Sequence, residues 1–273
     1  SDKSKPMELD LKKKYKIILL QSILLIFCPV LTAQTYNLTL KVDTAGTLNK
    51  LIAAEIKDSV VSLALSGELN GSDILFIREM AGSDKNGNIT KGNLAILDLS
   101  KATIVTGGSF FYLYYSTIEN KIGNYMFYKC PKLKSIILPE NVQYMGEYVF
   151  SECKSLESVY ISKGIISIGS QAFYKCPVFK SINVDSANDY LASIDGVLFD
   201  KGVSSLIMYP CQKQDSSYTI PSLVKTVYPE AFYDSDALKS LIIPNSVTTL
   251  GNSSFYHCSN LQYVTFSKNL TSI

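Results

Sequence analysis

The sequence predicts a repeat solenoid in which short parallel β-strands stack at a period of 23 residues. The first observation is the spacing of phenylalanines, because Phe127, Phe150 and Phe173 follow one another at intervals of 23, as do Phe232 and Phe255. The second is that glycine, cysteine and aliphatic residues recur at fixed offsets from each phenylalanine. One such unit cannot bury its apolar face alone, so neighbouring units must stack into one continuous core.

Each repeat contains one short predicted strand. In the first copy Leu133, Ile136 and Leu138 give the spacing L-x-x-L-x-L, and the last two positions alternate as in a strand with one buried face. One strand per 23 residues is a leucine-rich-repeat period. The glycines at 123, 146, 169 and 251 are expected to supply a bend with unusual dihedral angles between turns.

An insertion at residues 186–220 breaks the period, since Phe173 and Phe232 lie 59 residues apart. Residues 194–199 and 206–210 flank a six-residue turn and predict a β-hairpin. Residues 218–221 then predict another strand of the stack. The repeats proper are assigned to residues 121–273, and we expect them to be truncated at the C-terminus because the chain stops before the next repeat glycine.

Residues 34–120 are expected to form an N-terminal capping section with degenerate leucine-rich repeats, since terminal units of repeat arrays are atypical. The alternating pattern at 36–42 predicts a strand, and 47–56 predicts a short helix. Residues 61–65 and 94–105 resemble degenerate repeat strands, and 81–92 predicts a polar loop.

Residues 1–33 predict a secretory signal peptide with upstream residues, because lysines at 12–14 and 16 precede an apolar run that ends in Leu31-Thr32-Ala33. The run at 17–31 holds fifteen residues, including Pro29, whereas a membrane-spanning helix needs about 20. A retained membrane anchor is the alternative. Lipoprotein processing at Cys28 is disfavoured, since Phe27 stands where a lipobox has a small residue.

The charge balance disfavours nucleic acid as a partner. Residues 1–33 hold six lysines and three acids, so the rest of the chain has 20 basic and 21 acidic residues and a net charge of −1. Arg78 is the only arginine, and no basic block able to follow a phosphate backbone remains.

The repeats resemble the BspA-like leucine-rich-repeat family of bacterial surface proteins. That family's repeat is roughly I-G-x-x-A-F-x-x-C-x-x-L-x-x-I-x-I-P-x-x-V, and residues 122–273 follow it through Ile122-Gly123, Phe127 and Cys130 in the first copy. The family's I-x-G-V-L-Y/F hairpin insertion is similar to residues 194–199. Met126 and Val149 stand at the usual alanine and alter packing only. The resemblance implies an exported or cell-surface repeat protein, some members being adhesins.

No catalytic, metal-binding or cofactor-binding residues are predicted. The cysteines at 130, 153, 176 and 258 share one repeat position, so we expect a buried ladder of unpaired thiols, a disulfide or metal set being the alternative. His257 is the only histidine and occupies a position that elsewhere carries either charge, typical of a solvated face. No nucleophile or orienting acid is evident near it, and the sequence singles out no pair of acidic residues of the kind that glycosidases use.

Candidate binding residues are those strand positions that point away from the core, because stacking aligns them into rows on the expected concave face. Exposed apolar side chains within a polar rim are typical of protein-binding sites, although the same residue types also simply suit strands. The rows are Lys134, Glu157, Lys180, Lys239 and Gln262; Ser135, Ser158, Ser181, Ser240 and Tyr263; and Ile137, Tyr160, Asn183, Ile242 and Thr265.

A second candidate row follows the phenylalanines. Tyrosine has an apolar ring and a polar tip that suit sugars or proteins, although packing of each ring against its own turn is the simpler interpretation. The row consists of Tyr128, Tyr174, Tyr233 and Tyr256. We expect an adhesion-like module for a protein or glycan ligand, such as host extracellular matrix or another cell surface, attached to a membrane only through the signal segment or an anchor outside this chain. A structural spacer for a longer surface protein is the alternative.

Overall fold

The computed structural model describes residues 34–272, and residues 34–273 form one compact unit. The predicted signal segment at 1–33 lies outside the described residues. No helix within 34–272 is long and apolar enough to cross a membrane.

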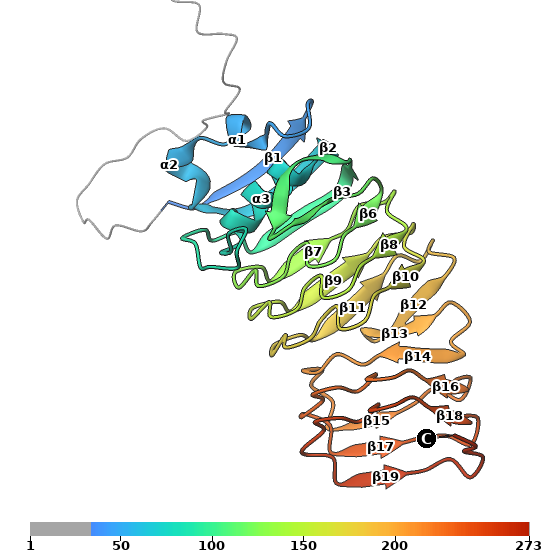
Figure 1. Ribbon diagram of the computed structural model, residues 1–273. Coiled ribbons are helices and arrows are strands. Elements are labelled where there is room, and N and C mark those ends of the chain that lie inside the picture. Colours follow the sequence, from blue (N-terminus) through green and yellow to red (C-terminus); the bar gives the residue numbers. More distant parts are fainter. Residues whose placement is uncertain (1–33, 273) are drawn as a thin grey trace, which may run out of the picture. The chain divides into compact units, whose positions relative to one another are not determined.

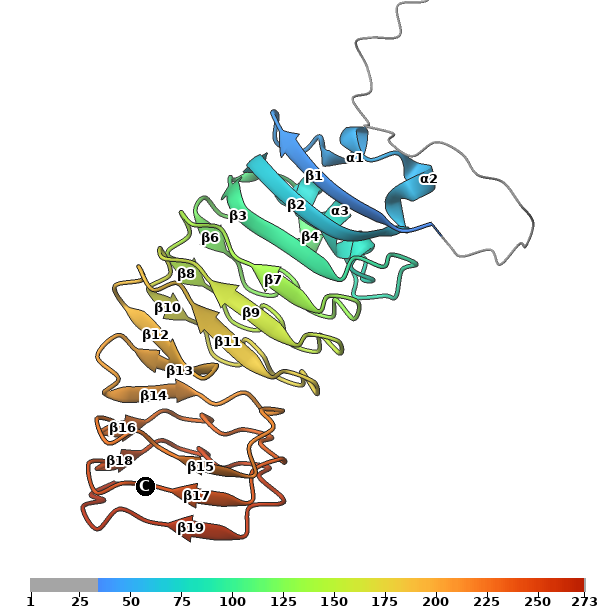
Figure 2. The same cartoon turned by 180° about the vertical axis from the view of Figure 1, so that it is seen from behind.

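Parallel strands succeed one another in chain order along the molecule, which confirms the predicted leucine-rich-repeat solenoid (Figures 1 and 2). The six-stranded sheet contains β1 (Tyr36–Val42), β2 (Val60–Leu69), β3 (Ile96–Ile104), β7 (Ser135–Ile137), β9 (Ser158–Ile161) and β11 (Ser181–Val184). A second, short sheet on the other side of the turns contains β6 (Lys121–Ile122), β8 (Tyr144–Met145) and β10 (Ser167–Ile168).

The N-terminal section is continuous with the repeats, because β1, β2 and β3 extend the sheet that contains the repeat strands. The strand predicted at 36–42 is confirmed, whereas the helix predicted at 47–56 is split into α1 (Leu48–Leu51) and α2 (Ala54–Lys57). The section also contains α3 (Gly71–Met80) and a hairpin of β4 (Gly107–Tyr112) and β5 (Tyr115–Thr117), which were not predicted from the sequence.

A capping box starts α3 and ties it to α1. The Asn70 side chain accepts from the Ser72 amide at 2.9 Å, and the Asp73 carboxylate accepts from the Asn70 amide at 3.0 Å. The same buried carboxylate accepts from the Leu48 amide at 2.9 Å, at the start of α1. The Asp73 carboxylate therefore holds both helix starts together.

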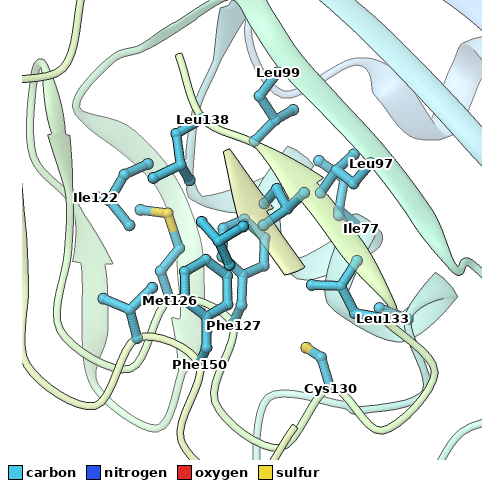
Figure 3. Close-up of a cluster of buried hydrophobic side chains, with 14 of the residues drawn as sticks. Ile77, Leu97, Leu99, Ile122, Met126, Phe127, Cys130, Leu133, Leu138 and Phe150 are labelled. Atoms are coloured by element: carbon cyan, nitrogen blue, oxygen red, sulfur yellow. The ribbon is translucent and has the colours of Figure 1, made fainter. Parts of the chain in front are cut away.

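The repeat core is a stack of aromatic rings. Phe127 stacks on Phe150 and Phe150 on Phe173, each with ring centroids 5.6 Å apart. Figure 3 shows the first two rings inside a shell that includes Ile122, Leu133 and Leu138. Each turn of the solenoid contributes one ring to this stack, which explains why the phenylalanines recur every 23 residues.

The prediction that the repeat glycines supply unusual dihedral angles is wrong. Gly169 has no positive φ, but a Cβ there would lie 2.5 Å from the carbonyl carbon of Gly146 and 2.6 Å from the amide nitrogen of Glu147. Glycine is needed at 146, 169 and 251 because each turn there approaches the preceding turn too closely for a side chain, whereas a Cβ at Gly123, in the first turn, would lie no nearer than 3.6 Å to another atom. Positive φ falls on two non-glycine positions of each turn, at Tyr125, Tyr148, Gln171, Glu230 and Ser253 and at Lys129, Glu152, Lys175, Asp234 and His257.

The predicted ladder of buried, unpaired thiols is confirmed for Cys130, Cys153 and Cys176, whereas Cys258 is only partly buried. Within residues 34–272 all five are free, and those at 130, 153 and 176 are buried. The Cys153 thiol donates to the Phe127 carbonyl at 3.0 Å, and Cys176 and Cys258 make the same bond to the phenylalanine one repeat earlier. The thiol ladder thus satisfies carbonyls inside the stack, while Cys211 and Cys258 are only partly buried.

The insertion divides the molecule into two hydrophobic cores. Strand β13 (Val197–Asp200) pairs antiparallel with β12 (Leu191–Ile194) on one side and with β14 (Ser205–Met208) on the other. The same sheet continues in parallel from β14 to β16 (Thr226–Val227) and then to β18 (Thr249–Leu250). The first three residues of β13 are buried, and alternation directs Leu198 to the first core and Val197 and Phe199 to the second.

The predicted hairpin at the insertion is present between β13 and β14, but its first strand was placed wrongly. Residues 194–199 are not one strand, because Asp195 and Gly196, with φ of 49° and 78°, form a tight turn between β12 and β13. An Asp-Gly pair is a strong hairpin signal that the interpretation overlooked. The strand expected at 218–221 is present as β15 (Ser217–Thr219).

Candidate binding face

The candidate rows are built by strand register. Ser135 pairs with Ser158 and Ser158 with Ser181, while Ile137 pairs with Tyr160 and Tyr160 with Asn183. Pairing continues into the N-terminal section, which the sequence analysis did not foresee. The full serine row is Asn37, Ser62, Ile96, Ser135, Ser158 and Ser181, and the full tyrosine-160 row is Thr39, Ala64, Asp98, Ile137, Tyr160 and Asn183.

The five-member rows expected from the sequence are divided between two sheets. Strands β15, β17 (Ser240–Ile242) and β19 (Tyr263–Thr265) form a separate sheet, so Lys239, Ile242 and Thr265 do not continue the rows that end at β11. The cause is the insertion, which occupies the edge of β11 where another repeat strand would lie. The Ile182 amide donates to the Gly196 carbonyl at 2.9 Å, and the Val184 amide donates to the Ser193 hydroxyl at 3.0 Å.

Tyr160 is the aromatic side chain of the tyrosine-160 row. It is 37% exposed, whereas Ile137 beside it is half-buried rather than exposed as expected. Partial burial and the nearby Asp185 carboxylate raise the pKa of the Tyr160 phenol. The phenol therefore stays neutral at physiological pH and can donate or accept a hydrogen bond.

Residues of alternating charge, Lys134, Glu157 and Lys180, directly precede the three serines of the repeats in the sequence. The Lys180 ammonium lies 2.8 Å from the Glu157 carboxylate, and this hydrogen bond lowers the pKa of Glu157. Lys134 is exposed in the preceding repeat, and its carbonyl accepts from the Glu157 amide at 2.8 Å. The sheet face thus presents an aromatic ring, serine hydroxyls and charged side chains.

The predicted row of tyrosines that follow the phenylalanines is divided into two groups in the structure. Tyr174 and Tyr233 have ring centroids 5.4 Å apart, and Tyr233 stacks on Tyr256 at 5.8 Å. Tyr128 is separate: its hydroxyl donates to Glu152 at 2.8 Å, and its ring contacts Tyr112 at 5.2 Å. Packing therefore accounts for Tyr128. The aromatic cluster around it, which the sequence analysis missed, contains Tyr112, Tyr114, Tyr115, Tyr125, Tyr128 and Tyr148.

His257 is exposed, and its Nδ1 lies 3.9 Å from the Asp234 carboxylate. Within residues 34–272, no three His, Cys, Asp or Glu side chains are placed to hold a metal ion together.

Comparison with known proteins decides the family. The model of the BspA type leucine rich repeat region matches residues 120–210 and 203–273, in six copies and over more than half of the chain. The chain belongs to the BspA-type leucine-rich repeat family. No curated protein matches it.

Several solved structures are similar to this BspA-type chain. The pneumococcal vaccine antigen PcpA is 23% identical, with 77% of this chain and 53% of that chain covered and a TM-score of 0.49. A leucine rich cell surface protein from Faecalibacterium prausnitzii is 22% identical, with 78% and 62% covered and a TM-score of 0.48. A leucine-rich repeat protein from Bacteroides ovatus is 17% identical, with 79% and 63% covered and a TM-score of 0.35. This chain spans less than two thirds of the length of each.

Proposed function

We propose that this chain is an exported, non-catalytic binding protein that holds a protein or glycan ligand on the outer face of its six-stranded sheet. The observation that supports this proposal is the register that brings Asp98, Ile137, Tyr160 and Asn183 into one row. An aromatic ring, a carboxylate and an amide on neighbouring strands are the groups with which proteins bind sugars and peptides.

The small side chains around Tyr160 support the same proposal. Serines occupy the neighbouring row at Ser135, Ser158 and Ser181, so hydroxyl groups border the row that contains Tyr160. A ligand laid across several strands makes many weak contacts here, and a rigid sheet holds these contacts without a large entropy cost. The expected ligands belong to host extracellular matrix or to another cell surface, and no cofactor is involved.

The test is binding of residues 34–273 to an array of extracellular-matrix proteins, mucins and glycans. Tyr160→Asp is expected to abolish saturable binding without unfolding the protein, because it replaces the ring by a charge on an exposed position. Tyr144→Asp is the matched control, since Tyr144 is 44% exposed on β8 of the other sheet. Equal binding by both variants would refute the assignment to this face, and absence of binding by the unaltered protein would favour a structural spacer.

Export is a separate part of the proposal and rests on residues 1–33. The basic, apolar and small-residue order of that segment supports it. Deleting 1–33 is expected to leave the protein in the cytoplasm of a bacterial host, whereas the intact chain is found outside it. Cytoplasmic retention of the intact chain would contradict export.

A further inference from the structure

In the regular part of the stack, consecutive turns are joined by a ladder of three hydrogen bonds on the phenylalanine side. Two residues of positive φ in each turn direct alternate amides to the same side. In the first rung these are the amides of Tyr125, Phe127 and Lys129, which donate to the carbonyls of Glu147, Val149 and Ser151 at 3.0, 2.9 and 3.0 Å. The ladder recurs from Tyr148, Phe150 and Glu152 to Ser170, Ala172 and Tyr174, and from Glu230, Phe232 and Asp234 to Asn252, Ser254 and Tyr256.

The ladder is interrupted at the insertion. By the repeat pattern the next donors are the amides of Gln171, Phe173 and Lys175, yet none of them has an acceptor within the described residues 34–272. The carbonyls of Pro229 and Tyr233, on the turn that continues the stack, likewise accept no hydrogen bond there. Buried backbone groups are nearly always paired in folded proteins, and Phe173 is buried, so its unpaired amide marks a place where the ladder lacks an acceptor. The amides of Gln171 and Lys175 on either side are open to a partner in the same direction.

The cause of the interruption is an incomplete turn within the insertion. Tyr209 occupies the phenylalanine position, 23 residues before Phe232, and its ring stacks on Phe232 at 5.1 Å. Its amide donates to the Ala231 carbonyl at 2.7 Å, the middle bond of a normal ladder. By the same two-residue spacing the next donor would be the Cys211 amide, which has no backbone acceptor within residues 34–272. The chain turns away at this point, and the Gln212 amide donates to the Phe179 carbonyl at 2.9 Å.

The unfilled part of this turn is a cleft of about 650 Å³. Its floor is apolar and is formed by side chains from β10, β13 and β14, namely Ile168, Leu198, Ile207 and Met208, with Phe179. Tyr174 and Tyr233 line it from facing turns, with their ring centroids 5.4 Å apart. The volume lies within the range of protein ligand sites.

The two walls of the cleft carry opposite charge. The wall with the three unpaired amides also carries Lys154 and Lys175. The facing wall, with the two unpaired carbonyls, carries Glu230, Asp234 and Asp236. A polypeptide backbone has carbonyl oxygens for the first wall and amides for the second, and a basic side chain complements the carboxylates.

We propose that this cleft binds an extended peptide segment of a partner protein, which completes the interrupted ladder. Carbonyls of the peptide accept from the Gln171, Phe173 and Lys175 amides, and a peptide amide donates to a carbonyl of the facing turn. An aliphatic side chain fills the apolar floor, and a neighbouring lysine or arginine pairs with the acidic wall. This is strand addition at the edge of a turn ladder, and it goes beyond the binding proposed for the sheet face.

Hydrogen exchange tests the free amides without any ligand. In residues 34–273 alone, the amides of Gln171, Phe173 and Lys175 are expected to exchange at least about tenfold faster than those of Tyr148, Phe150 and Glu152, which occupy the same positions in the closed ladder. Equal protection of the two sets would show that the ladder is closed in solution and would overturn the proposal.

The binding probe is the peptide acetyl-Ser-Lys-Leu-Val-Lys-Ser-amide, added during amide NMR spectroscopy. Saturable shifts of the Gln171, Phe173 and Lys175 amides are expected, and the charge-reversed peptide acetyl-Ser-Glu-Leu-Val-Glu-Ser-amide should bind about tenfold more weakly. Absence of these shifts at millimolar peptide would overturn the proposal. So would shifts of the same amides with a sulfated disaccharide but not with the peptide, because the cleft would then be a glycan site.

Matched variants localise the binding. Ser170→Trp places a large ring in the cleft while keeping the backbone, and it should weaken peptide binding by at least about tenfold. Glu147→Trp makes the same addition at the same repeat position of a closed rung and should leave binding unchanged. Glu230→Gln should weaken binding of the basic peptide more than Glu147→Gln does. Tyr160→Asp should have no effect, so failure of the cleft and failure of the sheet face remain distinguishable.

Discussion

Replacing Arg78 by methionine tests how the repeat stack begins. Arg78 lies on α3 and is fully buried. Its guanidinium donates through Nη1 to the Met126 carbonyl at 3.1 Å, and through Nη2 to the Ser83 hydroxyl at 3.1 Å and the Asp84 carbonyl at 3.2 Å. Among residues 34–272 no carboxylate forms an ion pair with it. A buried cation is therefore held by neutral oxygens.

The reason for this arrangement is the position of Met126 in the first turn. In the following turns the equivalent carbonyls, those of Val149 and Ala172, accept from the Phe127 and Phe150 amides at 2.9 and 2.8 Å. The first turn has no preceding repeat, so Arg78 supplies the missing donor. The arginine thus acts as a side-chain cap on the backbone ladder.

The expected loss of stability follows from the groups left without partners. Arg78→Met keeps an apolar stem of similar length but leaves the buried Met126 carbonyl and the buried Ser83 hydroxyl without this donor, at about 1–3 kcal/mol for each buried unsatisfied group. Removing a desolvated charge offsets part of this cost, so we expect a net loss of about 3 kcal/mol. Arg78→Lys should restore less than half, because an ammonium cannot bond several carbonyls with the fixed geometry of the guanidinium.

The assay is urea unfolding of residues 34–273, combined with hydrogen exchange of single amides. Exchange should quicken in residues 123–130 and stay unchanged in 252–258, since neighbouring turns are coupled only locally in a solenoid. Lys85→Met is the charge-matched control, because Lys85 is exposed. A loss below about 1 kcal/mol, or faster exchange along the whole chain, would refute the capping role.

Three further predictions concern the repeats. Gly169→Ala should lower the free energy of unfolding in urea by more than about 2 kcal/mol, because its Cβ would lie 2.5 Å from the Gly146 backbone. Gly202→Ala is the control and should change stability by less than about 0.5 kcal/mol, because its Cβ meets nothing nearer than 3.7 Å. Equal effects would contradict the explanation by close approach of the turns. The Glu140 carboxyl has a pKa of about 2, because the side chains of Lys101 and Lys163 bond and attract its charged form. The contribution of Glu140 to stability is therefore present above pH 4.5, its usual pKa, and is lost as the pH falls through about 2. Lys163→Met should raise the titration midpoint of Glu140 measured by NMR, and an unchanged midpoint would argue against the pairing. Burial raises the pKa of two ladder thiols, to about 11 for Cys130 and about 12 for Cys176, so a maleimide at pH 8 should label these two only after unfolding. Rapid labelling of either thiol in the native protein, located by peptide mapping, would contradict its burial.

The candidate face could be predicted in part from the sequence. Alternation within each strand and a constant period were enough to place Ser158 beside Ser181 and Tyr160 beside Asn183, because both follow from stacking alone. The contributions of Asp98 and Thr39 were missed, since their strands depart from the repeat consensus and only pairing shows that they share the sheet. The division between two sheets was also missed, because the consequence of an insertion for its neighbours depends on where its strands pack.

The repeat architecture was determined by the sequence itself. A ring every 23 residues, with aliphatic positions at fixed offsets, leaves each unit one way to bury its apolar face, so the pattern specifies the stack. Only the tertiary structure decided the special sites. The buried Arg78 has no repeat partner in sequence, and the amides of Gln171, Phe173 and Lys175 are unpaired because the chain leaves the turn that Tyr209 begins. Backbone groups leave no mark on the pattern of side chains, so whether they find partners is determined by distances across the fold.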